Sequence, residues 1–258
     1  MPPWASEVNL AALLSVEFLG VALVFARIGG IVMFMPAFGE SFVPVRHRLA
    51  LALVLALALY PAVPQGPISL DAPGPLVGMI AIELTLGLWI GLTARILLSA
   101  LEFAGSQIGL VSGLSNAFSP GLGSFQGSTL ISTGLMLGGV AVIFATDLHH
   151  LIIAAMISSY QIFPPGQILP SDLAQQIVKA VSQSFYLGLS IVAPFYVMGL
   201  LVNLGMGLAS RMMPSLPVFF VAAPVLIMAG LLVLVMATPV MLREFAERFG
   251  EWLGMMVF

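Results

Sequence analysis

The sequence has no cysteine and few charged residues. Without cysteine among its 258 residues, it cannot form disulfides, thiolate nucleophiles or cysteine-based metal sites. Only 7% of the residues are charged, against roughly 25% in ordinary soluble domains. The net charge of −3 leaves no basic face for neutralising the phosphates of a nucleic acid.

Motifs of hydrolytic and nucleotide-driven chemistry are also missing. The sequence contains no GxxxxGK[ST] phosphate loop, no HExxH pair and no GxSxG elbow. We therefore expect no enzymatic activity, no catalytic residues and no cofactor. The first apolar run has no Lys or Arg ahead of it, so we expect no cleavable signal peptide.

What the sequence does have is long apolar segments. Hydrophobic residues make up 60% of the chain, and its mean hydropathy is +1.12. A bilayer core requires about 20 apolar residues per helix, and the neutral tracts predict an all-α protein of the integral membrane class, built from long, kinked helical hairpins. The predicted helices cover residues 10–35, 49–60, 76–101, 130–160, 171–209 and 218–242. The segment 49–60 is too short to span comfortably.

A proline-rich connection, FPPGQILPSD over residues 163–172, is the clearest internal boundary, because its prolines cannot sit inside a helix. It divides the chain into residues 1–165 and 166–258. The positive-inside rule gives conflicting orientations, because Arg211 and the pair Arg243 and Arg248 flank the same apolar run at opposite ends.

Several charged residues lie within the predicted helices, where charge is unfavourable unless it has a function or a partner. Interhelical ion pairs that fix packing are the favoured interpretation, ahead of a proton or substrate pathway. Arg95 and Glu102 share one helix face but stand two turns apart, so each is expected to pair with another helix. The candidate buried charges are Glu17, Arg27, Glu83, Arg95, Glu102 and Asp147.

Asp147 is followed by His149 and His150, which are metal-competent residue types. Adjacent side chains on a helix point about 100° apart, so the two histidines cannot readily share one ion. We expect no metal site.

Glycines four residues apart allow helices to approach closely in a membrane. Gly87 and Gly91 have this spacing, and Gly105, Gly109 and Gly113 extend it over two steps. The last three open the stretch GSQIGLVSGLSNAFSPGLGSFQG, residues 105–127, which cannot remain helical over residues 116–123. Irregular backbone at membrane depth is tolerated only inside protein or along a water-filled path. The stretch is therefore either an internal element that lines or closes a passage, or an aqueous loop.

The tail over residues 242–253 predicts an amphipathic helix. Leu242, Phe245, Phe249 and Trp252 share one face, and Arg243 and Arg248 stand four residues from Glu247 and Glu244 on the other. A membrane-surface anchor is favoured over a partner-docking helix.

Three blocks of the sequence form a recognisable series. The first runs from Arg27 through Pro36, Gly39 and Pro44 to Arg46, and the second is LHHLIIAAMISSYQIFPPG. The third is APFYVMGLLVNLGMGLASRMMPSLPVFFVAAPVLIMAG, which carries Asn203, Arg211, Pro214 and Pro224. Together the blocks resemble the FliR family of flagellar biosynthetic proteins, and these four residues, with Pro36 and Arg46, are the family-pattern residues. Export proteins of injectisomes, of the SpaR and YscT type, belong to the same superfamily.

The resemblance implies a non-enzymatic subunit of the type III export gate, in the bacterial inner membrane at the flagellar basal body. It implies FliP-like, FliQ-like and FlhB-like partners, unfolded export substrates and membrane lipid, with no nucleic acid. Residues 1–165 would be the FliP-like part and residues 166–258 the FliQ-like part.

In the family the Gly/Ser-rich central loop is associated with plugging the channel, which implies this role for residues 111–127. The residues concerned are Val111, Asn116, Phe118, Pro120, Gly121, Gly123, Phe125 and Gly127. Two alternatives stay open: an injectisome subunit, and a proton-coupled secondary transporter that uses Glu83, Arg95, Glu102 and Asp147.

Overall fold

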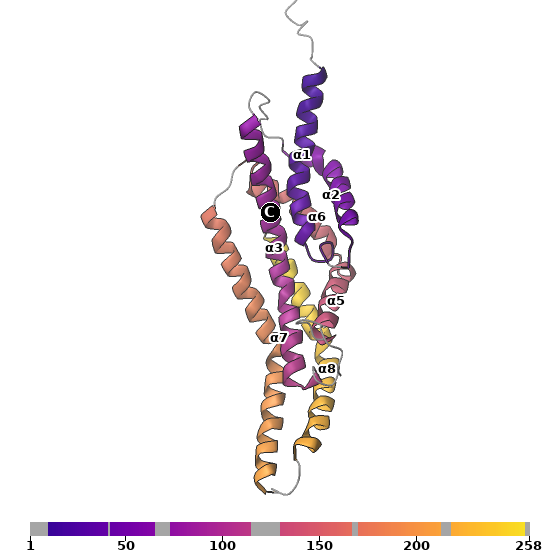
Figure 1. Ribbon diagram of the computed structural model, residues 1–258, viewed down its shortest axis with the longest axis vertical. Coiled ribbons are helices and arrows are strands. Elements are labelled where there is room, and N and C mark those ends of the chain that lie inside the picture. The colour runs from indigo at the N-terminus through magenta and orange to yellow at the C-terminus, as the bar shows by residue number, and fades with distance from the viewer. Residues whose placement is uncertain are drawn as a thin grey trace, which may run out of the picture. The chain divides into compact units, whose positions relative to one another are not determined.

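A computed structural model of the chain describes residues 10–40, 42–64, 73–114, 130–166, 170–212 and 218–255, and every regular element in these ranges is helical. The all-α prediction is confirmed. Five of the described helices are long and apolar enough to cross a membrane, or six if α5 and α6 form one bent span. The elements are α1 (Leu10–Phe34), α2 (Val45–Leu59), the 3₁₀ helix η1 (Tyr60–Ala62), α3 (Pro73–Val111), α5 (Leu130–Ala145), α6 (Leu148–Ile162), α7 (Pro170–Met212) and α8 (Val218–Gly254) (Figure 1).

The helix boundaries differ from the prediction in several places. α2 begins four residues early, directly after Pro44, and with η1 it gives an apolar window of 18 residues, so the expectation that it is too short to span is wrong. α3 continues ten residues past 101, to Val111, and Gly105 and Gly109 lie inside this extension. The run 130–160 is divided at Asp147, whose φ of 58° is left-handed and ends the helical path.

Prolines do not end the two C-terminal helices. Pro194 lies inside α7, and Pro224 and Pro239 lie inside α8. The predicted separate tail helix is therefore wrong, because residues 242–253 are the last turns of α8. Its apolar face is buried in protein, with Phe245 and Phe249 at most 1% exposed. α7 and α8 run side by side (Figure 1), and both helices line a cavity of about 260 Å³ next to Pro194.

The chain forms two compact units that alternate along the sequence. The first unit comprises Met1–Arg95, His149–Gln176 and Trp252–Phe258, and so holds α1, α2 and the first half of α3. The second comprises Ile96–Leu148 and Ile177–Glu251, with the rest of α3, all of α5 and most of α7 and α8.

In the first unit, α1 and α3 cross with their backbones nearly in contact. A Cβ atom on Gly87 would collide with the Arg27 carbonyl oxygen, and one on Gly91 would lie 2.6 Å from the Ile31 carbonyl oxygen. From the other helix, a Cβ on Gly30 would lie 2.8 Å from the Leu88 nitrogen. Glycine is therefore required on both helices for this separation.

In the second unit, Gly105 of α3 lies directly against the backbone of Ser132 on α5. The Ser132 hydroxyl donates to the Glu102 carbonyl oxygen at 2.8 Å, which fixes the two helices at this point. Gly109 is buried within α3. Gly113 differs from the helical series expected, because it lies past the end of α3 with a φ of +68°. It ends the helix and does not extend the packing edge.

Candidate functional site

The most completely buried charge in the described part of the chain is Arg27 of α1, whose exposure is 0%. Its Nε and Nη2 donate to the two carboxylate oxygens of Glu83 on α3, at 2.6 and 2.9 Å. Its Nη1 donates to the carbonyl oxygens of Ser159 at 3.2 Å and Phe163 at 3.0 Å. The guanidinium also lies 3.9 Å from the centre of the Tyr160 ring. Four of the five N–H donors of an arginine are therefore satisfied by protein.

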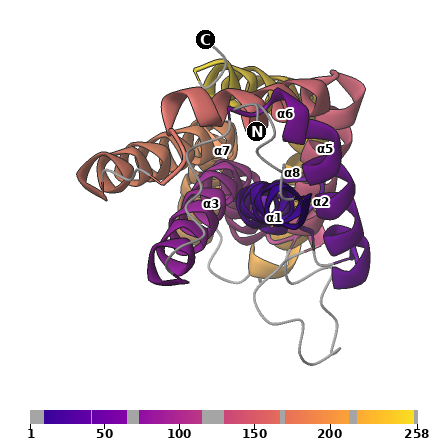
Figure 2. The same ribbon diagram turned by 90° about the horizontal axis from the view of Figure 1, so that it is seen from above.

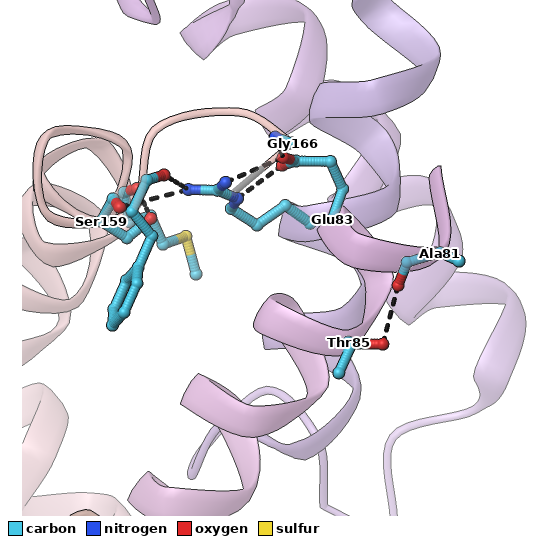
Figure 3. Close-up of polar contacts among 8 residues, drawn as sticks. Ala81, Glu83, Thr85, Ser159 and Gly166 are labelled. Carbon is cyan, nitrogen blue, oxygen red and sulfur yellow. Dashed lines mark hydrogen bonds and ion pairs between the residues drawn. The ribbon is translucent and has the colours of Figure 1, made fainter. Parts of the chain in front are cut away.

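Local sequence explains why the pair forms here. Glu83 stands one helical turn before Gly87, where α1 and α3 are closest, so the two side chains meet without extra space between the helices. Ser159 and Phe163 supply carbonyl groups from the C-terminal end of α6, where a cation is favoured by the helix dipole. Figure 3 shows Glu83 and Ser159 on opposite sides of this network.

The same network holds the connection between α6 and α7. Glu83 Oε1 accepts a hydrogen bond from the backbone N–H of Gly166 at 3.3 Å. By contrast, Thr85 bonds within its own helix to the Ala81 carbonyl oxygen and takes no part (Figure 3). Six residues on from Glu83, the indole Nε1 of Trp89 donates to the Leu173 carbonyl oxygen at 3.0 Å. The Trp89 ring also meets Phe163 edge-on at 5.7 Å. The described ends of this connection are thus fixed to α1 and α3.

A second buried ion pair, also in the first unit, joins Glu40 to Arg95. The Glu40 carboxylate is 1% exposed and the Arg95 side chain is 31% exposed. Arg48 donates to the carbonyl oxygens of Glu40 at 2.8 Å and Val43 at 2.9 Å. Glu40 is not among the buried charges expected from the sequence. The available signal was a carboxylate in the short connection between two apolar helices, where it requires a partner.

The other candidate charges lie in different surroundings. Glu17 is exposed, although its carboxylate accepts a hydrogen bond from the Tyr60 hydroxyl at 2.6 Å. Asp147 is exposed because the chain turns there, and Glu102 is half-buried. The rings of His149 and His150 lie 4.1 Å apart and their ring nitrogens are close enough to share one ion, so the expectation that these two side chains cannot do so does not hold.

The family-pattern residues have mainly structural surroundings. Pro36 is buried in the turn after α1, and Arg46 is exposed at the start of α2. Asn203 bonds back to the Gly199 carbonyl oxygen within α7, at 2.8 Å. Arg211 is exposed in the last turn of α7 and Pro224 is exposed within α8. Pro214 lies outside the described residues.

Of the central stretch, the structure describes only the beginning. Val111 is the last residue of α3, and a Cβ on Gly199 of α7 would lie 2.6 Å from its Cγ1. Ser112, the next residue, lies directly against Gly230 of α8. The remaining candidates lie outside the described residues: Asn116, Phe118, Pro120, Gly121, Gly123, Phe125 and Gly127.

Long apolar helices whose buried charges are neutralised as ion pairs define a helical membrane protein. The chain matches the family of bacterial export proteins, family 1, over residues 18–252, and it belongs to that family. Within the family it is similar to flagellar members, as the sequence resemblance indicated. It is a flagellar export-apparatus protein of the inner membrane, without enzymatic activity.

Individual relatives include two flagellar proteins and one protein of another export system. The flagellar biosynthetic protein FliR of Caulobacter vibrioides is 40% identical over 90% of this chain and 93% of that protein. The FliR protein of Bacillus subtilis is 29% identical over 84% of this chain and 85% of its own length. The Yop proteins translocation protein T of Yersinia pestis is also 29% identical, over 84% of both chains.

The structure gives no support to the transporter alternative. Glu83 and Arg95, two of its supposed coupling residues, are each neutralised by a partner, Arg27 and Glu40 respectively. A third, Asp147, is exposed.

Proposed function

We propose that the chain is a subunit of the flagellar type III export gate and forms part of the channel that unfolded flagellar proteins cross. The observation that carries this proposal is the family match over residues 18–252, together with the 40% identity to a flagellar biosynthetic protein.

Partner subunits follow from the same proposal: FliP-like, FliQ-like and FlhB-like proteins, with residues 1–165 acting as the FliP-like part and residues 166–258 as the FliQ-like part. Exposed apolar surface supports assembly. In the apolar window of α8 only 11% of residues are buried, and in that of α7 33%. Large apolar side chains such as Leu200, Leu204 and Val235 are more than half exposed. Surfaces of this kind are covered by other subunits or by lipid.

The central stretch, residues 111–127, is proposed as a movable closure of the channel, with Phe118 and Phe125 as the bulky groups. Two observations favour this role. The helix leading into the stretch ends at Val111, two residues before the left-handed Gly113, and Val111 and Ser112 pack against Gly199 and Gly230. A packed end of α3 followed by small residues suits a segment that moves while α3 stays in place.

Co-purification tests the assembly. A tagged chain expressed from its own chromosomal locus should retain FliP-like and FliQ-like proteins, and deletion of its gene should abolish motility. A chain that purifies alone as a monodisperse species, while the cells export normally, contradicts the proposal.

Ion leakage tests the closure separately. Replacement of Phe118 and Phe125 by alanine should make the membrane permeable to small ions while the complex still assembles. The matched control replaces both residues by leucine, which keeps most of the apolar volume and should leave the membrane tight. An alanine variant that assembles without leaking overturns the closure but leaves the assembly proposal intact.

A further inference from the structure

Helix α2 exposes most of its apolar surface. Only Ala52 and Ala56 are buried, one turn apart, on the face toward α1. Figure 2 shows α2 beside α1, with its other faces away from that helix. Leu49, Leu53, Val54 and Leu57 are 47–62% exposed. Small residues therefore attach α2 to α1, and its larger apolar residues remain uncovered.

The uncovered face is basic at one end. Arg46 and His47 lie exposed in the first turn of α2, which contains no acidic residue. Their side chains form no hydrogen bond or ion pair with the residues that the structure describes, unlike the neighbouring Arg48, which binds two carbonyl groups. Positive charge in a first turn is also unfavourable with the helix dipole. Contacts within the described part of the chain therefore do not explain these two residues.

We propose that α2 is a lipid-facing helix, with Leu49, Leu53, Val54 and Leu57 against acyl chains and with Arg46 and His47 on the phosphates of anionic phospholipids. Lipid fits this surface better than protein. From Leu49 to Leu59 the helix is built only of Leu, Ala and Val, so it offers no side-chain hydrogen bond to a partner. Protein interfaces carry about one hydrogen bond per 100–200 Å², whereas acyl chains need none.

The two ends of the helix also fit the two sides of a hydrocarbon layer. From Arg46 to Tyr60 the helix rises about 21 Å. The long arginine side chain and the tyrosine hydroxyl extend this span toward the ~30 Å of a bilayer core. Basic residues at one end and an aromatic residue at the other are typical of membrane interfaces. Anionic lipid at the Arg46 end would neutralise the basic side chains there, as it does for basic residues beside other membrane helices.

Spin-label accessibility tests the position of the apolar face. The native chain has no cysteine, so Val54→Cys and Ala56→Cys each give a single labelling site in the full chain. In vesicles of phosphatidylcholine and phosphatidylglycerol, a label at Val54 should collide with dissolved oxygen more than with an aqueous nickel chelate. The buried control at Ala56 should be shielded from both. A label at Val54 that favours nickel, or that is shielded from both reagents in the purified export complex, overturns the proposal.

Lipid retention tests the basic end. Native mass spectrometry of the detergent-purified full chain should show retention of phosphatidylglycerol over phosphatidylcholine. Arg46→Gln should weaken this preference about fivefold, the effect expected of one basic residue at an anionic surface. The matched control is Lys179→Gln, which removes one exposed positive charge from α7. An unchanged preference in Arg46→Gln, or equal losses in both variants, overturns the proposal.

Discussion

Arg27 and Glu83 form a bidentate ion pair that solvent does not reach. Both carboxylate oxygens accept hydrogen bonds from the guanidinium, at 2.6 and 2.9 Å, and the side chains are 0% and 1% exposed. In such surroundings a charge is tolerated only with its partner, so each residue makes the other necessary.

Replacing one partner should therefore damage the protein more than replacing both. Glu83→Gln leaves the Arg27 charge buried and uncompensated, which should lower the free energy of unfolding by about 3–5 kcal/mol. The double variant Arg27→Met with Glu83→Met removes both charges and should recover much of this loss. Denaturant unfolding of the purified chains in detergent compares both variants with the native chain. A double variant that loses as much stability as Glu83→Gln, or more, would show that the two residues do not act as a pair.

An exposed ion pair on α8 supplies the control for the Arg27–Glu83 variants. Arg243 and Glu247 are 81% and 54% exposed and lie 2.8 Å apart on α8. Arg243→Gln should change the free energy of unfolding by at most about 1 kcal/mol. An effect as large as that of Glu83→Gln would mean that burial is not what distinguishes the Arg27 pair.

The second ion pair should respond asymmetrically. Glu40 is 1% exposed and Arg95 is 31% exposed, so water can solvate the arginine but not the carboxylate. Arg95→Gln leaves a buried charge and should be destabilising by several kcal/mol, whereas Glu40→Gln should lower the free energy of unfolding by only about 1–2 kcal/mol. Unfolding of the two single variants under identical conditions measures the difference. Equal losses of stability, or a larger loss for Glu40→Gln, would contradict the view that water solvates Arg95 but not the Glu40 carboxylate.

Two glycines inside helices, Gly87 of α3 and Gly29 of α1, should differ sharply in the effect of replacement by alanine on stability. A Cβ on Gly87 would collide with the Arg27 carbonyl oxygen, whereas one on Gly29 would meet nothing within 4 Å. Gly87→Ala should therefore separate α1 from α3 and destabilise the chain by about 2 kcal/mol or more. Gly29→Ala should stabilise it by up to about 1 kcal/mol, through higher helix propensity. The shift of each variant's thermal midpoint from that of the native chain, measured in detergent, gives the comparison. A Gly87→Ala variant with an unchanged midpoint would show that the helices are not in contact there.

Local features of this fold could be predicted from the sequence. The apolar period and the flanking turn residues place α1 at residues 10–35, within one residue of Leu10–Phe34. The prediction of α8 ended at residue 242, because the charged tail was assigned to an amphipathic helix of its own, whereas α8 continues to Gly254. The break at Asp147 was also missed, since aspartate is only a weak signal for a left-handed residue.

Which charges pair could not be predicted. Arg27 and Glu83 were both identified as candidates, but they are 56 residues apart, and their contact depends on a helix crossing that only the folded chain defines. Glu40 and Arg95, 55 residues apart, depend likewise on the turn after α1. Spacing along one helix shows which residues share a face, but it does not show which other helix that face meets.

Trp89 tests how firmly the connection between α6 and α7 is held. Its indole Nε1 donates to the Leu173 carbonyl oxygen at 3.0 Å, and its ring contacts Phe163 edge-on. Trp89→Phe keeps an aromatic ring but leaves the carbonyl without its donor, which should cost about 1 kcal/mol of stability. Trp89→Ala also removes the buried ring and should cost about 3–5 kcal/mol. Hydrogen exchange of the peptides covering residues 159–176 should rise modestly in the first variant and strongly in the second. Unchanged exchange in Trp89→Ala would mean that the connection is held by the Arg27 network alone, with no contribution from the indole.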